Sequence, residues 1–368
     1  EESINRALSS SLINCRSSSD ALLVWSRLVD YAGRCNQTAA SIDRNNIDKR
    51  IQDLFFVENT VRIMPAPITE IDLFIPAIAL IGAWKEDNQY DCQIIEKISG
   101  MKYSEFEAKA RNMICHNSEY LQLVNGSWNV QHKEELLDQC KDEFFDDCIE
   151  RLFKAVNIVL AQSNKRVMSQ TRFYIYSGSE YDNSYELRRS LVKSICWVKT
   201  NLPELSNCNK SKIEGHMIQL VRGLLEDADW TTWANLGDCL QDLAELAPAE
   251  YLDRVEWSAL HKKQEMLNLF PKRESDFFSG NCYISELLWS LEILAWSPDY
   301  LIKSICTLGL LEALPYEETN WSNTPINSIV SILLPWYPQT LADIEKRKNA
   351  LKSLKNDNAD IFWAVLKK

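Results

Sequence analysis

A repeated segment in the C-terminal half constrains the fold more than any other feature of this sequence. LAELAPAEYLDRV begins at Leu243, and LEILAWSPDYLIKSI begins at Leu291. Both contain Leu-x-x-Leu-Ala, then a proline, an acidic residue, a tyrosine and a leucine, and LKNDNADIFWAVL near the end is a fainter third copy. Helix–turn–helix units that recur at this spacing are typical of α-solenoids of the HEAT or TPR kind.

The second copy allows a more detailed prediction. We expect Ser297 to cap a helix that has Pro298 in its first turn, because serine and proline are favoured at these positions. The preceding helix should bury one stripe of side chains, formed by Leu287, Leu288, Leu291, Leu294 and Ala295.

The composition also favours helices. The 368 residues include 10 glycines and 11 prolines, so turns are sparse and long helices are favoured over many short strands. Hydrophobic residues make up 46% of the chain, which is typical of a globular protein. The sequence therefore predicts a mostly α fold.

A second module is predicted upstream of the repeats. Asp72 to Trp84, Cys92 to Ile98 and Tyr103 to Cys115 are expected helices, with Gly100 ending the second and Ser104 capping the third. YLQLVNGSWNVQ follows, and Asn-Gly between alternating apolar residues indicates a β-hairpin. Three helices and then a hairpin is the order of a winged helix.

Three domains follow from these patterns. We expect an N-terminal helical segment at 1–68, a winged-helix-like module at 69–133 and a domain of HEAT/TPR-like helical pairs at 134–368. The chain begins at Glu1 without a methionine, so we expect it to be an excised segment or a processed product.

The charge disfavours binding to nucleic acid. The net charge is −12, whereas non-specific binding to phosphates requires a positive surface. The third helix of the predicted module carries charges of both signs, and the hairpin tip has no arginine or lysine. A DNA reader would present a basic stripe there. The charged residues of that helix are Lys102, Glu105, Glu107, Lys109 and Arg111.

The cysteines indicate a reducing environment. There are 11, scattered along the chain without a CxxC pair, which favours buried free thiols in the cytoplasm. No apolar run approaches the roughly 18 residues of a membrane span. We therefore expect a cytoplasmic chain without a membrane segment.

Sequence motifs for catalysis are absent. No glycine precedes a lysine, so there is no P-loop, and GxGxxG, GxSxG and HExxH do not occur. The 4 histidines are far apart in sequence. We expect no catalytic residue, bound cofactor or metal site in this chain.

An aromatic segment, RFYIYSGSEYDNSYELRR from Arg172 to Arg189, is the first candidate contact surface. It gathers tyrosines around Gly178. The segment is either a clasp packed between helical units or a surface that contacts a partner. In the second case the contacts are Tyr174, Tyr176 and Tyr181.

The second candidate is WSNTPINSIVSILLPWYPQT, from Trp321 to Thr340. In a structural interpretation, the residues around Pro325 cap a helix, Pro335 and Pro338 end it, and Trp336 packs over its end. In the alternative, the segment docks an effector or a partner protomer. The contacts would then be Trp321, Asn327, Trp336 and Gln339.

Several passages, taken in order, resemble a known family. They are LVNGSWNV (Leu123 to Val130), YELRRSL (Tyr185 to Leu191), LLEDADWTTWANLGDCLQDLAELAP (Leu224 to Pro248), SGNCYISELLWSLEILAWSPDYL (Ser279 to Leu301) and the segment from Trp321 to Thr340. Together they resemble the region downstream of the nucleotide-binding module in large bacterial STAND-type P-loop ATPases, many of which are antiphage defence proteins.

The resemblance implies a switch. In such proteins a nucleotide-binding core precedes a winged helix and helical repeats, and the repeats recognise a trigger, commonly a phage protein. Recognition releases an effector domain through oligomerisation. This chain has no Walker motif and no effector, so ATP and Mg²⁺ would belong to the parent protein.

Three hypotheses follow. The first is a non-catalytic sensor segment of a STAND-like ATPase, which binds a protein partner or other domains of its parent chain. The second is a winged-helix transcription regulator with a helical ligand domain. The third is an all-α hydrolase, which metals or nucleotides would stabilise.

Overall fold

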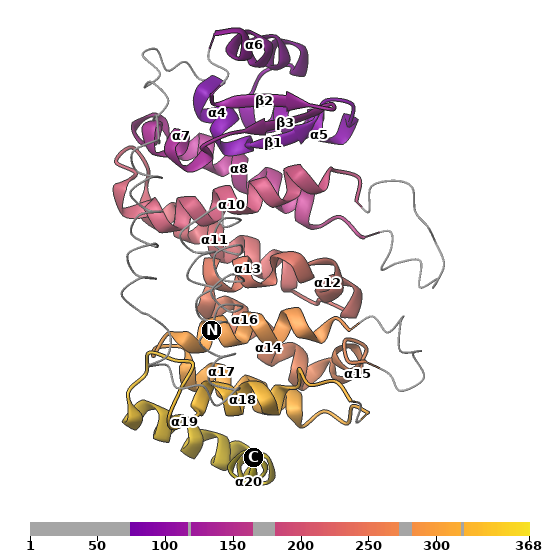
Figure 1. The fold of residues 1–368 in the computed structure, drawn as a ribbon, viewed down its shortest axis with the longest axis vertical. Coiled ribbons are helices and arrows are strands. Elements are labelled where there is room, and N and C mark those ends of the chain that lie inside the picture. The colour runs from indigo at the N-terminus through magenta and orange to yellow at the C-terminus, as the bar shows by residue number, and fades with distance from the viewer. Residues whose placement is uncertain (1–73, 117–118, 165–180, 272–281, 318–319) are drawn as a thin grey trace, which may run out of the picture. The chain divides into compact units, whose positions relative to one another are not determined.

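The computed structural model describes residues 74–116, 119–164, 181–271, 282–317 and 320–368. The chain divides into units at 1–66 and 67–368, and every described residue belongs to the second unit. The helices expected within residues 1–68 therefore lie outside the described residues. Within the described ranges the structure is mostly helical, as predicted (Figure 1).

The first described elements mix helices with short strands. In order they are α4 (Phe74–Ile81), β1 (Ala83–Lys85), α5 (Gln89–Ser99), α6 (Tyr103–His116), β2 (Leu121–Val124) and β3 (Ser127–Val130). The predicted helix from Asp72 to Trp84 is wrong at its C-terminal end. Gly82 adopts a φ of 76°, which ends α4, and Trp84 lies in a strand.

The three strands form an antiparallel sheet in the order β1-β3-β2. Asn125 and Gly126 join β2 to β3 with positive φ values of 51° and 76°, so the predicted hairpin is confirmed. Trp84 faces Trp128 across β1 and β3, and their stacked rings are 5.3 Å apart. Both indoles are fully buried, so this pair forms the centre of the small sheet's core.

The helix boundaries in this region follow local capping. The Asn88 side chain accepts hydrogen bonds from two backbone amides at the start of α5, and Gly100 ends α5 in a left-handed conformation, as predicted. The prediction that Ser104 caps α6 is wrong. The helix begins at Tyr103, and the Lys102 carbonyl accepts its first backbone hydrogen bonds.

A buried carboxylate connects this module to the helices that follow. Asp91 of α5 accepts hydrogen bonds from the amide and the hydroxyl of Ser184, at 2.9 and 2.5 Å. It also accepts from the Asn183 side chain at 3.0 Å and from the Lys85 amide at 3.0 Å. Ser184 is the N-cap of α10 (Tyr185–Asn201), so Asp91 fixes where that helix starts.

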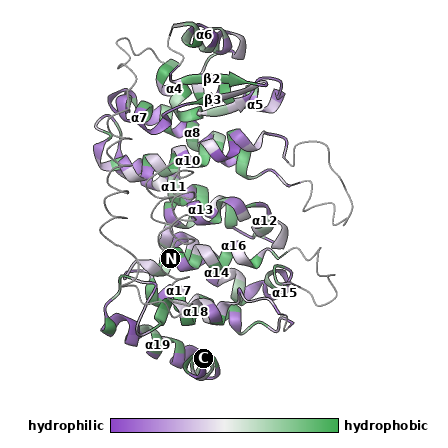
Figure 2. Cartoon of the chain, viewed as in Figure 1, coloured by the Kyte–Doolittle hydropathy of each residue, from purple (hydrophilic) through white to green (hydrophobic). Residues whose placement is uncertain are grey.

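The remaining long helices pack in two rows. One row consists of α8 (Asp146–Leu160), α11 (Lys210–Leu225), α14 (Pro248–His261), α17 (Leu301–Glu312) and α19 (Ile344–Asp357), each packed on the next. The other row consists of α10, α13 (Leu240–Leu246), α16 (Ile284–Trp296), α18 (Pro325–Leu333) and α20 (Ala359–Lys367). Most of these helices carry hydrophobic and hydrophilic residues side by side, as Figure 2 shows.

Two short elements precede the rows, between β3 and α8: α7 (Lys133–Gln139) and η2 (Lys141–Glu143). Four others lie between helices of the two rows: η3 (Leu202–Glu204), α12 (Trp230–Asn235), η4 (Gly237–Cys239) and α15 (Lys263–Leu267).

Both copies of the repeated segment form helix pairs. The first is α13 with α14, the second is α16 with α17, and equivalent helices of the two pairs pack on each other. Between the two pairs, the Tyr251 hydroxyl of α14 lies 2.7 Å from the Ser290 hydroxyl of α16. The expected stripe is buried at every position: Leu287, Leu288, Leu291, Leu294 and Ala295.

The predicted start of α17 is wrong. The helix begins at Leu301, and Ser297 is instead the C-cap of α16. The Ser297 carbonyl accepts hydrogen bonds from the amides of Tyr300 and Leu301, so a separate turn precedes the helix. In the first copy, by contrast, Pro248 opens α14 directly.

Lys133 joins three helices through its ammonium group. Its Nζ donates to the Ser190 carbonyl and hydroxyl, each at 2.8 Å, and approaches the Leu80 carbonyl at 3.5 Å. The stem of the side chain is partly exposed, but the ammonium lies in the interior. This burial, with a smaller contribution from Lys193, lowers the pKa of Lys133 to about 7.

The lowered pKa predicts a pH-dependent stability. The unfolded chain holds the Lys133 proton up to its ordinary pKa of 10.5, whereas the folded chain releases it near pH 7. The free energy of unfolding should therefore rise between pH 7 and 8.5, by up to about 1.4 kcal/mol per pH unit. Lys133→Met should lack this rise in urea titrations. If the free energy of unfolding of the variant rises with pH as steeply as that of the wild type, the assignment to Lys133 is wrong. Cysteine thiols titrate at higher pH, but both proteins contain them, so their contribution cancels in the comparison.

Candidate functional site

The candidate contact residues do not form one cluster. Tyr174 and Tyr176 lie outside the described residues, and Tyr181 is buried, with 6% of its surface exposed. Trp321 and Asn327 lie at the N-terminal end of α18, whereas Trp336 and Gln339 follow its C-terminal end. A helix of 9 residues is about 13 Å long, so the two pairs occupy separate places.

Within the first pair, Asn327 makes hydrogen bonds within the protein. The Asn327 side chain donates to the Ser322 carbonyl and accepts from the Lys368 ammonium, both at 2.6 Å. Its amide therefore stabilises the local turn and the contact with Lys368. Trp321 beside it is 45% exposed.

The position of Trp336 differs from the structural interpretation of the sequence, in which this side chain packs over the end of the helix. Helix α18 ends before Pro335 as predicted, but the Trp336 side chain is 80% exposed and does not pack over the helix end. Other groups satisfy the carbonyls there. The Gln339 amide donates to the Ser331 carbonyl, and Arg347 donates to the Leu334 carbonyl, both at 3.4 Å. The indole is thus left facing solvent.

Large apolar side chains are also exposed on the loop that carries Trp336, on the end of α16 and on the start of α19. The loop after α18 is held against the C-terminal end of α16, because the Leu341 amide donates to the Trp296 carbonyl at 3.0 Å. Thr340 and Ala342 point inward and are buried, so the alternation of the chain turns Leu341 outward. We define the Trp336 surface as five side chains that are 50–80% exposed: Trp296, Trp336, Tyr337, Leu341 and Ile344.

Such a surface is unusual on a folded protein. Single exposed apolar residues are common, but groups of large ones mark sites of contact. Tryptophan and tyrosine contribute most of the binding energy at many protein interfaces, because they bury a large area with few rotatable bonds. The Trp336 surface is therefore the candidate functional site.

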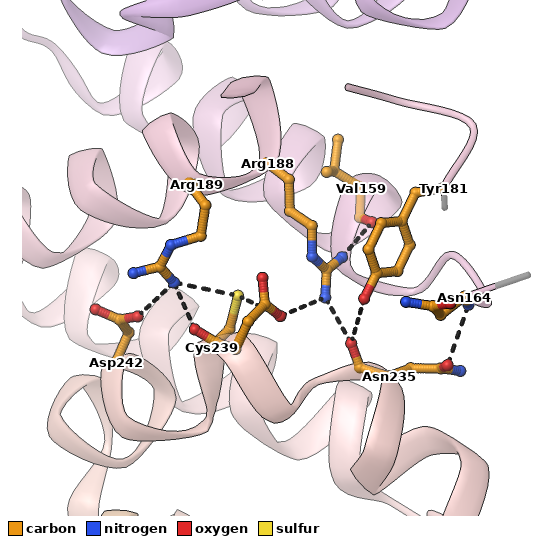
Figure 3. A network of polar contacts seen from close by, with 9 residues as sticks. Val159, Asn164, Tyr181, Arg188, Arg189, Asn235, Cys239 and Asp242 are labelled. Atoms are coloured by element: carbon orange, nitrogen blue, oxygen red, sulfur yellow. Dashed lines mark hydrogen bonds and ion pairs between the residues drawn. The ribbon is translucent and has the colours of Figure 1, made fainter. Parts of the chain in front are cut away.

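A buried polar network is the second prominent feature (Figure 3). Arg188 of α10 is 1% exposed, and its guanidinium donates to the carbonyls of Val159 and Asn235, both at 3.0 Å. These carbonyls lie in the last turns of α8 and α12, where the helix dipoles are negative. The guanidinium also lies over the Tyr181 ring and 3.5 Å from the Asp238 carboxylate. Arg188 thus joins the ends of two helices.

The network is suited to structure rather than to chemistry. Arg189 donates to the Asp238 carbonyl at 2.6 Å and to the Asp242 carboxylate at 3.0 Å. Cys239 lies beside it, but burial raises the pKa of its thiol to about 12. The thiol therefore stays protonated at neutral pH and is a poor nucleophile.

Sequence reasoning missed Arg188, although a signal was present. Leu191, Val192 and Ile195 follow it at helical spacing and are all buried. An arginine that precedes these positions by three, four and seven residues shares their face of the helix. Its side chain is therefore either buried with them or an exception to the apolar stripe. Its neighbour Tyr181 is buried, as the clasp interpretation predicts, and its hydroxyl donates to the Asn235 carbonyl at 2.9 Å.

Features of metal sites and membrane spans are absent from the described residues. Across these ranges, no three histidine, cysteine or acidic side chains are grouped so that they would hold a metal ion. No helix in the same ranges combines the length and the apolar character that crossing a membrane requires.

Comparison of the chain with protein-family models, with curated proteins and with solved structures found no match.

Proposed function

We propose that this chain is a non-catalytic sensor segment of a STAND-like defence ATPase and that it recognises a protein partner through the Trp336 surface. The exposure of Trp336 is the observation that carries this proposal. Trp336 is 80% exposed, and the four other apolar side chains of the surface are at least half exposed. Contact between this apolar area and water is unfavourable, and a bound partner would cover it.

The order of the elements supports the architecture of such a segment. The order α4-β1-α5-α6-β2-β3, with a sheet in which β3 is central, fits the proposed winged-helix-like module. The two rows of packed helices after it fit HEAT/TPR-like pairs, in which each unit contacts its neighbours along the row.

The charges of the module favour this role over DNA reading. Arg111 of α6 is paired with Glu107 at 2.6 Å and with Glu86 at 2.8 Å. A DNA-binding helix would leave its arginines for phosphates and bases. We therefore expect no specific gel shift of double-stranded DNA at physiological salt. A specific gel shift would instead support the transcription regulator.

The parent reading frame and its activity test the proposal. We expect GxxxxGK[ST] to be encoded upstream of Glu1, and we expect the intact gene to protect bacteria against at least one phage of a panel. Trp336→Ala combined with Tyr337→Ala should abolish that protection at an unchanged protein level. Trp363→Ala, which removes another exposed indole on α20, should retain it. A parent without a P-loop, or a double variant that protects fully, would contradict the proposal.

A further inference from the structure

The solvent face of α19 continues from the Trp336 surface and is basic. At 100° per residue, Lys348, Lys352 and Lys355 point away from the direction of Ala350 and Leu354, which are fully buried. Ile344, a member of the Trp336 surface, begins the same helix. Apolar and basic side chains thus follow one another along about 17 Å of helix.

This helix contrasts with the rest of the protein. It carries five basic residues and two acidic ones, Glu345 and Asp357, whereas the whole chain has a net charge of −12. A local positive surface on an acidic chain attracts an anionic partner.

The lysines are only weakly engaged within the protein. Lys348 pairs with Glu345 at 2.9 Å, but both side chains are mostly exposed, so the pair contributes little. Lys352 contacts an amide oxygen of Asn349, and Lys355 lies over the Phe362 ring. Neither forms an ion pair with a carboxylate among the residues that the structure describes. Their charges are available to a ligand.

The edge of the Trp336 surface disfavours nucleic acid as that ligand. Asp299, Asp343 and Glu345 are exposed close to the start of α19. Lys346 approaches Asp299 at 3.5 Å, and the Asp343 side chain accepts from the Lys346 amide. If nucleic-acid bases stacked on Trp336, the phosphate backbone would lie close to these carboxylates, and the negative charges would repel each other. A peptide, in contrast, can place single carboxylates on the lysines alone.

We propose that α19 and the Trp336 surface together bind an acidic segment of a partner protein, one that inserts aromatic or aliphatic side chains beside Trp336 and places carboxylates on Lys348, Lys352 and Lys355. This inference rests on the proposed function, because it names the chemistry of the partner at the same site. The apolar contacts supply affinity, and the charges supply orientation and rate of association.

A library of random 12-residue peptides, selected on the immobilised protein, tests the inference. The enriched peptides should be acidic and should contain tryptophan, phenylalanine or leucine. In calorimetric titrations, the charge-reversed variant Lys348→Glu, Lys352→Glu, Lys355→Glu should bind the best of them at least tenfold more weakly. Higher salt should also weaken their binding. The three positions face solvent, so the variant should melt like the wild type. Basic or neutral enriched peptides, unchanged binding by the variant, or preferred binding of single-stranded DNA would overturn the inference.

The phage assay separates this inference from the function on which it rests. If the tryptophan and tyrosine double variant loses protection while the charge-reversed variant keeps it, the partner is not acidic but the sensor role stands. If both variants protect fully, the sensor role itself fails.

Discussion

Replacing Arg188 with methionine is expected to lower the free energy of unfolding by about 3–5 kcal/mol, because each of two buried carbonyls that lose their donor costs about 1–3 kcal/mol. Methionine fills much of the same volume but removes every donor of the guanidinium. The carbonyls of Val159 and Asn235 would lose their shared partner, and Asp238 would lose its cation. The helix ends of α8 and α12 would then repel each other without compensation.

Urea unfolding followed by circular dichroism measures this loss. Arg188→Lys should have an intermediate effect, because one ammonium does not span two carbonyls and stack on Tyr181 at the same time. Lys154→Met is the matched surface control, since Lys154 is exposed and paired with Glu150, and it should change stability by less than about 1 kcal/mol. A methionine variant as stable as this control would show that the network contributes nothing.

The second large effect is expected at Asp91. Changing it to alanine leaves four donors without their acceptor in the interior: two on Ser184, one on Asn183 and one on Lys85. An unsatisfied buried donor costs about 1–3 kcal/mol, and water that enters the cavity offsets part of the sum. We expect a net loss of about 3 kcal/mol.

The position of the loss distinguishes this prediction from general destabilisation. Amide hydrogen exchange should accelerate first at the start of α10, because Ser184 loses the group that holds its hydroxyl in the capping position. Asp91→Asn keeps one acceptor oxygen and should recover part of the stability. If exchange at Leu187 were unchanged in the alanine variant, the link between α5 and α10 would not depend on this carboxylate.

Local signals explain which parts of the fold the sequence could predict. Asn125 and Gly126 set the hairpin through their own backbone preferences, and Gly100 ends α5 for the same reason. The stripe from Leu287 to Ala295 follows from helical spacing alone. Strand β1 could not be found in this way. Its three residues are extended because β3 lies beside them, and that pairing joins positions far apart in the chain.

The candidate site was predicted only in part. Of the five residues of the Trp336 surface, the sequence predicts only Trp336 as a contact, and it does not indicate whether that indole faces solvent or covers a helix end. That outcome depends on Arg347 and Gln339, which satisfy the end of α18 from elsewhere. Tyr181 is a contact residue only if the segment from Arg172 to Arg189 is a surface. Its burial against Arg188 and Asn235 fits the alternative, a packed clasp.

The exposure of Trp336 also gives the protein an optical reporter of its own. Trp84, Trp128 and Trp233 are fully buried, whereas the Trp336 indole is 80% exposed. An indole in water emits at longer wavelengths than a buried one and is reached more readily by a dissolved quencher. Occupation of its surroundings would therefore change the colour and the quenching of the native fluorescence, so that binding can be followed on the unlabelled protein.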